Sequence, residues 1–324
     1  MNQNEAERRP RRWPRGGLEA VRDYAIVGSF VLLFAVLAVS AERFLTPVNL
    51  LNTAEAGAIY GVVAIGLTIL LIVGEFDLSA GAICVFAGIV AAKLEPSLGA
   101  WPSLAGGIVA GIAIGAFNGA TVCFARVNSF VATLACSLIV VGLGTAVTNG
   151  FQLYIADPAF GTLGNGKVLG VDMFVWIFVA FAAVSGFCLA RTRLGRWLYA
   201  AGDNPDAARL AGIDVRALRF GAFVFSGFAA GVAGAILISR TGTAIAGAGL
   251  ADILFPAIAA VVVGGTSIQG GKGAIWRTVL GIFFLELIRN GFNLLEVDPY
   301  YQSICQGVII LLAVSADGFS RRTG

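Results

Sequence analysis

Long apolar segments recur along most of this chain, and short polar connections separate them. Each segment is apolar on every face, which is typical of membrane helices, because the strands of a membrane barrel alternate apolar and polar residues. The pattern predicts an all-α polytopic membrane protein with about ten transmembrane helices. The expected spans are 24–40, 57–73, 78–94, 104–125, 130–148, 171–190, 218–239, 253–265, 274–295 and 301–315.

Two of these spans have more than one possible interpretation. Span 24–40 follows a basic stretch, but it is longer than the apolar region of a typical signal peptide, so we expect a retained first helix. Span 253–265 is short and contains Pro256. It either begins nearer Ala244, with Asp252 inside the protein, or is a broken or re-entrant segment.

Composition agrees with this class. Hydrophobic residues make up 58% of the 324 residues and charged residues 13%, whereas a soluble domain is about half apolar and a quarter charged. The chain has no histidine, the commonest general base and metal ligand. Its five cysteines lie singly in apolar segments, which is typical of small buried hydrophobic residues. Catalytic motifs such as HExxH or GxSxG do not occur, so we expect no enzyme activity and no metal site.

The positive charges give the orientation. Most of the 22 Lys and Arg residues fall on the side of the two termini and of the polar stretch 191–219; the exceptions are Arg43, Lys93, Lys167, Arg240 and Arg289. Cytoplasmic connections carry an excess of Lys and Arg. We therefore expect a cytoplasmic basic tail over 1–23, a transmembrane domain over 24–317 with a cytoplasmic loop at 191–219, and a cytoplasmic tail over 318–324.

Within the polar stretch 191–219 lies a compact helix signal. Asn204 is a favourable N-cap, and Pro205 suits the first helical position. Gly212 is placed to end the helix in a left-handed conformation. Ala207, Leu210 and Ala211 fall on one side of the resulting two turns. A helix this short needs a packing partner, which is the rest of the protein, the membrane surface or a second protein.

The segment 264–273 resembles a phosphate-binding loop only superficially. A Walker A motif needs glycine six residues before its lysine and Ser or Thr directly after it. Around Lys272 these positions hold Thr266 and Gly273. We expect a flexible cytoplasmic turn here and no ATP site.

Polar residues inside apolar spans are costly and mark candidate sites. The stretch 74–81 joins the second and third spans, and Asp77 or Ser79 is expected to cap the third helix. Glu286 and Arg289 lie three residues apart on one helix face, where a structural pair and a pore lining are both consistent with the pattern. The residues expected to line a translocation pathway for a neutral, hydroxyl-rich solute are Asp77, Asn118, Thr133, Asn290, Asn293 and Gln302.

Small residues recur at a four-residue spacing in two spans. The rows are Gly107, Gly111, Gly115 and Gly119 in one span, and Gly227 and Gly231 in another. Such rows let helix backbones approach closely. We expect tight packing of these helices.

Four ordered blocks, at 74–92, 118–135, 195–215 and 259–281, resemble the permease subunits of ABC-type monosaccharide importers, the family of the ribose, xylose and galactose systems. Two positions depart from the family pattern. Glu75 stands where the family usually has glycine, which adds a charge near the inner mouth. Asn128-Ser129 replace a proline before Phe130, which is expected to loosen the start of the fifth span.

The resemblance implies a set of partners. Two permease copies, identical or related, would form the pathway in the bacterial cytoplasmic membrane. Two cytoplasmic ATPase subunits would use ATP and Mg²⁺, a periplasmic binding protein would deliver the sugar, and this chain would bind no cofactor and no nucleic acid. The residues implied to couple to the ATPase are Gly202, Asn204, Asp206, Ala207, Ala208, Arg209, Leu210 and Gly212.

Three functions were weighed from the sequence. The first is an importer permease that moves a pentose or hexose, although polyols also pass through relatives. The alternative is a secondary transporter driven by an ion gradient, which needs acids placed to bind H⁺ or Na⁺. Glu286 is the one acid deep in a predicted span, and Arg289 is placed to neutralise it. A membrane scaffold without transport leaves the cytoplasmic helix unexplained.

Overall fold

The computed structural model describes residues 16–247, 250–298, 300–302, 304–305, 307–308 and 311. The long helices are α1 (Gly16–Ser40), α2 (Pro47–Ile72), α3 (Ala80–Leu98), α4 (Ala100–Cys123), α5 (Ser129–Thr148), α7 (Met173–Arg191), α10 (Val215–Thr241), α11 (Leu250–Val263) and α12 (Ile275–Leu294). The short elements are β1 (Leu153–Tyr154), η1 (Pro158–Gly161), α6 (Thr162–Asn165), β2 (Lys167–Val168), β3 (Val171–Asp172), α8 (Arg193–Asp203), α9 (Pro205–Leu210) and β4 (Thr243–Ala244).

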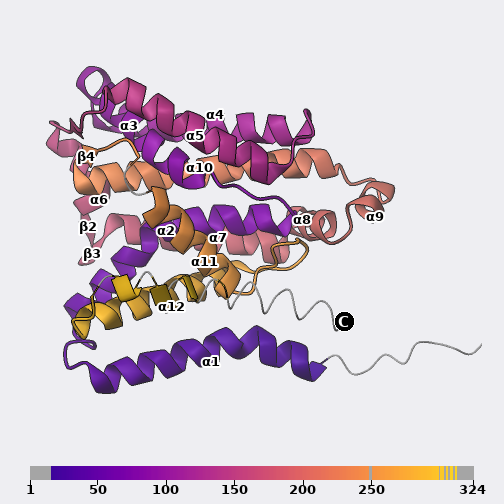
Figure 1. Cartoon of the computed structure of the whole chain (residues 1–324), viewed down its shortest axis with the longest axis horizontal. Helices are drawn as coiled ribbons and strands as arrows, with labels where there is room; N and C mark the ends of the chain where they lie inside the picture. The colour runs from indigo at the N-terminus through magenta and orange to yellow at the C-terminus, as the bar shows by residue number, and fades with distance from the viewer. Residues whose placement is uncertain are drawn as a thin grey trace, which may run out of the picture.

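The long helices lie side by side in a bundle (Figure 1). Helix α2 runs through its middle and contacts α7, α10, α11 and α12. Helices α3 and α4 pack on one side of α10, and α5 packs against α3 and α4. Helix α1 packs against α12 on the opposite side of the bundle. The largest buried cluster is centred on α2, whose residues from Val62 to Ile72 are all buried.

Six of the described helices are long and apolar enough to cross a membrane: α2, α3, α4, α5, α7 and α10. Two shorter apolar helices cover Ile26–Ser40 and Asp252–Val263. The protein is therefore an all-α, multi-pass membrane protein. Much of the expected last span, 301–315, lies outside the described residues, as do most of the two expected tails. The number of ten spans and the cytoplasmic position of both termini stay predictions.

Several helix starts differ clearly from the sequence prediction. Helix α1 is described from Gly16 rather than from residue 24, within the stretch expected to be a cytoplasmic tail. Helix α2 begins at Pro47 rather than near residue 57, because the Thr46 hydroxyl accepts the Asn49 N–H and Pro47 occupies the first turn. This adds Glu55 to the helix. Helix α11 is described from Leu250, with Pro256 inside the helix. Asp252 is exposed, so the alternative that placed it inside the protein was wrong.

The predicted close packing of the glycine rows is confirmed between α4 and α10. A Cβ atom built on Gly111 would lie 2.6 Å from the carbonyl oxygen of Gly227, and one built on Gly115 would lie 2.5 Å from that of Phe223. Side chains at these positions would separate the backbones. This contact is called the glycine seam below, and its residues are Gly111, Gly115, Gly227 and Gly231.

The start of α5 is capped rather than loosened, so that expectation was wrong. The Asn128 side-chain oxygen accepts the backbone N–H groups of Phe130 at 3.0 Å and Val131 at 3.4 Å. Asparagine is a favourable N-cap because its short side chain reaches these otherwise unpaired groups. The replacement of the family's proline therefore keeps a defined helix start.

The segment between α5 and α7 is ordered by short pairings. Strand β1 pairs with β4 after α10, and β2 pairs with β3. The Glu95 carboxylate accepts the Asp157 N–H at 2.7 Å, and the Ser239 hydroxyl accepts the Gly164 N–H at 2.8 Å. These contacts attach the segment to α3 and α10 at the end of the bundle opposite α8 and α9 (Figure 1).

Candidate functional site

Helix α9 has the ends that the sequence predicts. The Asn204 side chain accepts the Ala207 N–H at 3.0 Å, and Pro205 opens the helix. Gly212 has φ of +81°, a conformation that glycine adopts without a steric penalty. The Ile213 N–H bonds the Ala208 carbonyl at 3.0 Å and closes the last turn. The predicted helix and both of its caps are confirmed.

The packing partner of α9 is the protein itself, through one residue. Ala208 is 4% exposed and packs in a small cluster with Ala201 and Val215. The opposite side is open, and Leu210 is 92% exposed. The eight candidate coupling residues thus divide by burial. Ala208 faces inward, Gly202 is half-buried, and the exposed members are Asn204, Asp206, Ala207, Arg209, Leu210 and Gly212.

A longer helix, α8, precedes α9 and was not predicted. The Thr192 hydroxyl caps it by accepting the Gly195 N–H at 3.3 Å. Its inner side buries Leu198 and Ala201, while Trp197 on the outer side is 46% exposed. Its arginines are typical of a connection between spans. Its apolar residues nevertheless recur at helical spacing, and this spacing could have predicted the helix.

The segment 264–273 is packed against α8 and the end of α2, so it is not the free turn that we expected. The Gly271 N–H donates to the Ile72 carbonyl at 2.9 Å, and the Tyr199 hydroxyl donates to the Gly273 carbonyl at 2.8 Å. Burial raises the pKa of the Tyr199 phenol, which keeps the proton that this bond needs. A Cβ atom on Gly202 would lie 1.8 Å from the Ile72 carbonyl oxygen. We call this contact of Gly202, Ile72 and Gly271 the glycine junction.

Three of the candidate pathway residues meet in one buried network. Asp77, Asn118 and Thr133 are each 0% exposed. The Asp77 carboxylate accepts the Ser79 N–H at 2.8 Å and the Ser226 hydroxyl at 2.8 Å. The Asn118 amide donates to the Ser79 hydroxyl at 2.8 Å, and the Thr133 hydroxyl accepts the Leu78 N–H at 3.0 Å. This network joins the connection between α2 and α3 to α4, α5 and α10.

The expected cap of α3 is provided by Asp77, since Ser79 makes no side-chain capping bond of its own. Within the described residues, the Asn118 side-chain oxygen has no hydrogen-bond partner. No cavity described below is lined by Asp77, Asn118 or Thr133. In this conformation the network is closed, and its role in a pathway stays a prediction.

The other three candidate pathway residues lie at the opposite end of the bundle. Asn290 on α12 exchanges side-chain hydrogen bonds with Asn49 at the start of α2, at 2.7 and 3.1 Å. The Gln302 amide donates to the Asn293 side-chain oxygen at 2.8 Å. Figure 1 shows this end of α12 far from α8 and α9. The six candidates therefore form two separate groups rather than one site.

Two acids inside the long helices, Glu286 and Glu55, have arginine partners. Glu286 lies 3.9 Å from Arg289, whose guanidinium also donates to the Tyr60 hydroxyl at 2.8 Å. Glu55, which the sequence analysis placed outside a span, lies 3.3 Å from Arg240. Pairing of this kind lowers the cost of a charge in lipid.

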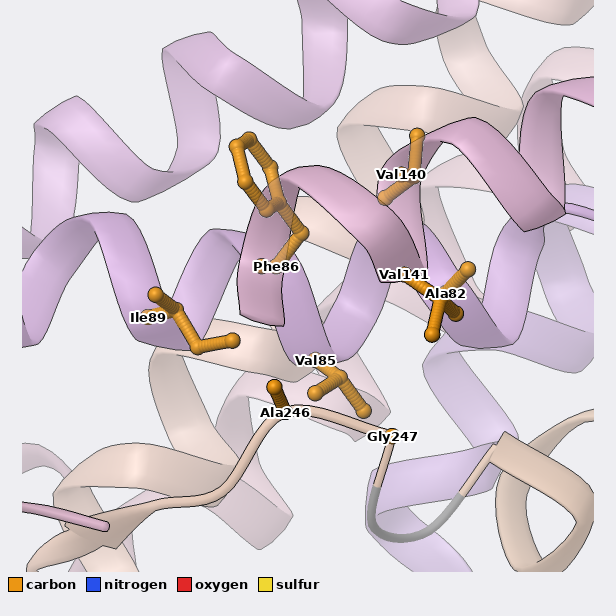
Figure 2. A pocket seen from close by; sticks show the side chains of 9 residues that line it. Ala82, Val85, Phe86, Ile89, Val140, Val141, Ala246 and Gly247 are labelled. Atoms are coloured by element: carbon orange, nitrogen blue, oxygen red, sulfur yellow. The ribbon is translucent and has the colours of Figure 1, made fainter. Parts of the chain in front are cut away.

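A small apolar pocket lies between α3, α5 and the segment after β4. Its volume is about 10 Å³, roughly the space for one water. Figure 2 shows Val85 and Ile89 from α3, Val140 from α5 and Ala246 around it, all with carbon side chains. A sugar needs far more room and hydroxyl partners, so this pocket does not hold one.

Residues 49–314 match the family described as branched-chain amino acid transport system / permease component. The chain is 38% identical over 294 residues to the ribose import permease protein of Escherichia coli (strain K12), an alignment that covers 89% of this chain and 91% of the relative. It is 34% identical over 311 residues to the L-arabinose ABC transporter permease protein of Azospirillum brasilense, with 95% and 91% covered. No solved structure matches the chain.

Proposed function

Since this chain belongs to the family of ABC transporter permease components that includes the ribose and arabinose import permeases, we propose that it forms the membrane pathway of an ATP-driven importer. The solute is a small neutral sugar, a pentose or hexose, and it moves into the cytoplasm. Two permease copies, two ATPase subunits and a periplasmic binding protein complete the assembly in the cytoplasmic membrane. The permease chain itself is not catalytic.

The exposed side of α9 is the observation that carries this proposal. A two-turn helix with a cap at each end lies at the end of the bundle, where Ala208 is its one buried residue and Leu210 is 92% exposed. Exposed apolar side chains beside small residues favour insertion into a partner's groove. An ATPase that closes on α9 would push on α8, and the glycine junction would carry that push to Ile72 at the end of α2.

The ion pairs weigh against the ion-driven alternative. An acid that binds H⁺ or Na⁺ in turn must be free of a permanent cationic partner. Glu55 and Glu286 both have arginine partners. Asp77 and Glu95 are buried acids with neutral partners. Asp77 accepts the hydroxyls of Ser79 and Ser226, and Glu95 accepts the Asp157 N–H. Uptake without any ATPase is therefore the measurement that separates the two mechanisms.

The solute class rests on the relatives. Their names specify ribose and L-arabinose, whereas the family description specifies branched-chain amino acids. Neutral polar side chains such as Asn118, Thr133 and Asn290 suit hydroxyl groups and offer no paired charges for a zwitterion. We therefore expect pentoses or hexoses to stimulate the assembly and leucine to have no effect.

The test is reconstitution of this permease in lipid vesicles with its cognate ATPase and binding protein. ATP hydrolysis is measured with a panel of ribose, arabinose, xylose, galactose and leucine. Stimulation by one sugar, together with sugar entry that requires ATP, supports the proposal. Sugar entry in vesicles without the ATPase would show the ion-driven mechanism instead, and stimulation by leucine alone would contradict the sugar assignment.

A further inference from the structure

A polar cavity of about 650 Å³ lies beside α9, and its lining includes no residue of the glycine junction and none of Asp77, Asn118 and Thr133. It is bounded by the connection between α2 and α3, the turn between α4 and α5, and the segment from α9 into α10. Four arginines and one acid line it. The charged lining residues are Arg126, Arg209, Arg216, Arg219 and Glu75.

Two of the four arginines have no acidic partner among the described residues. Arg219 pairs with Glu75 at 2.9 Å, and Arg209 pairs with the exposed Asp206. Arg126 and Arg216 are exposed at the rim and form no ion pair within the described part of the chain. The Arg219 Nε atom is buried and has no hydrogen-bond partner within the same part of the chain. The cavity thus holds an excess of positive charge and an unused buried donor.

The backbone at Arg126 adds an independent observation. Arg126 has φ of +59°, a left-handed conformation that glycine or asparagine adopts more readily. It sits in the tight turn that ends α4, where the Val127 N–H bonds the Thr121 carbonyl. The backbone at residue 126 favours glycine, yet the position carries an arginine at the rim of the cavity. This combination is consistent with a binding role for the Arg126 side chain.

Size and donor geometry specify the ligand class. Pockets for small ligands typically measure about 300–1,000 Å³, and this cavity falls in that range. Planar guanidinium groups match phosphate oxygens with two parallel hydrogen bonds each. The positive end of α5, a helix of 20 residues, also borders the cavity at Asn128 and Ser129. We propose that this cavity binds a phosphate-bearing anion.

Two sources supply such an anion at this end of the protein: a soluble phosphate compound, or the headgroup of an anionic phospholipid. Both would bridge Arg209 in the last turn of α9, Arg216 at the start of α10 and Arg126 in the turn after α4. A bound anion would therefore fix the position of α9 relative to α4 and α10. The binding itself requires only the folded chain and does not depend on the transport function proposed above.

The experiment uses the full chain, purified in a neutral detergent without phosphate. Inorganic pyrophosphate is the soluble probe, and binding is read from the unfolding temperature as a function of its concentration. Dioleoyl phosphatidylglycerol is the lipid probe, and dioleoyl phosphatidylcholine is its neutral comparison; native mass spectrometry counts the retained lipid. We expect saturable binding of one probe, weakened by added salt.

The variant Arg126→Gly with Arg216→Gln removes both unpaired charges, and glycine also suits the backbone at residue 126. We expect binding to weaken at least about tenfold, because hydrogen bonds between charged groups are lost. Arg196→Gln on α8 removes one charge of the same type outside the cavity and should leave binding unchanged. Arg216→Gln alone, at an exposed position, is the second variant if the double variant does not fold.

The outcomes separate the sources. Pyrophosphate binding that the cavity variants lose identifies a soluble phosphate compound, and phosphatidylglycerol binding that they lose identifies a lipid headgroup. Equal binding by the wild type and the cavity variants overturns the proposal. Failure of both probes to bind also overturns it, and if the cavity variants then lose only their association with the ATPase, the arginines serve a protein contact instead.

Discussion

The glycine seam between α4 and α10 and the helix α9 lie in the same chain but are attached in opposite ways. In the seam, backbones touch along two helices, and side chains would not fit at Gly111, Gly115 or Gly227. Helix α9 makes its main inward contact through the buried Ala208, and its other residues are exposed except for the half-buried Pro205. Closely packed helices move together, because their side chains have no room to rearrange. A helix with few contacts, such as α9, is free to bind a partner.

The difference suggests a division of roles. The seam would hold α4 and α10 as one rigid unit, and α9 would receive the movement of the ATPase. The glycine junction lies between the two, since Gly202 at the end of α8 contacts the α2 backbone as closely as the seam glycines contact each other. Each prediction below tests one part of this contrast, in order of decreasing effect on stability.

The largest effect is expected in the seam. Gly227→Ala places a Cβ atom 2.3 Å from the Gly111 carbonyl oxygen, so the two helices must separate. We expect a loss of about 3 kcal/mol in unfolding free energy, the upper range for overpacking, measured as thermal unfolding in detergent. Gly221→Ala on the same helix meets no atom within 4 Å and should stabilise instead, because alanine is the better helix former. Equal melting of the two variants would show that the seam tolerates separation.

A smaller effect is expected at the glycine junction. Gly202→Ala moves α8 away from α2, because its Cβ atom would meet the Ile72 carbonyl oxygen. The displacement affects only the end of the bundle, so we expect a loss of about 2 kcal/mol in stability and a loss of sugar-stimulated ATP hydrolysis. Gly186→Ala on α7 makes only ordinary contact with Ile275 and is the matched control. Normal stimulation in the Gly202 variant would exclude the junction from coupling.

Local signals in the sequence predicted some of these features and not others. Asn204, Pro205 and Gly212 specify the ends of α9 by themselves, because caps depend on neighbouring residues. A cap residue before a proline, Thr46 before Pro47, also marks the start of α2. The predicted span began at residue 57 and so did not include Glu55. The glycine rows indicated close packing but not which helices meet, and the two groups of pathway candidates depend on contacts between distant segments that spacing does not show.

Two neighbouring alanines of α9, Ala207 and Ala208, differ in burial and can be compared directly. The family resemblance implies a coupling role for both Ala207 and Ala208. The structure separates the two positions, since Ala207 is exposed and Ala208 is buried. Ala208→Glu should detach α9 and cost about 1 kcal/mol, because only a local contact is lost and the helix end is free to move into solvent.

Ala207→Glu should melt like the wild type and lose sugar-stimulated ATP hydrolysis, because the new side chain would point at the ATPase. Both variants are measured by thermal unfolding and by hydrolysis in reconstituted vesicles. Normal hydrolysis by the Ala207 variant would contradict the docking role of α9. Equal loss of stability in both variants would contradict the burial difference.

The smallest measurable loss of stability is expected at the ion pair that links the α2–α3 connection to α10. The Glu75 carboxylate lies 2.9 Å from the Arg219 guanidinium, and the two side chains are 8% and 27% exposed. Glu75→Gln keeps the size of the side chain and removes the charge. We expect a loss of about 0.5 kcal/mol, since partial exposure screens the pair. The exposed Glu42→Gln is the control and should change nothing.

A double-mutant cycle with Arg219→Gln isolates the pair from other effects of each change. The coupling energy should decrease as salt is raised, as expected for a pair within reach of solvent. A cycle of Glu75→Gln with Gly227→Ala tests the contrast directly. If their effects add, the ion pair and the glycine seam act independently, and the seam is a rigid unit in its own right. If the two effects on stability do not add, the charge at Glu75 helps to hold α10 against α4. The start of α10 then belongs with α9, the helix that receives the movement, and not with the rigid unit of α4 and α10.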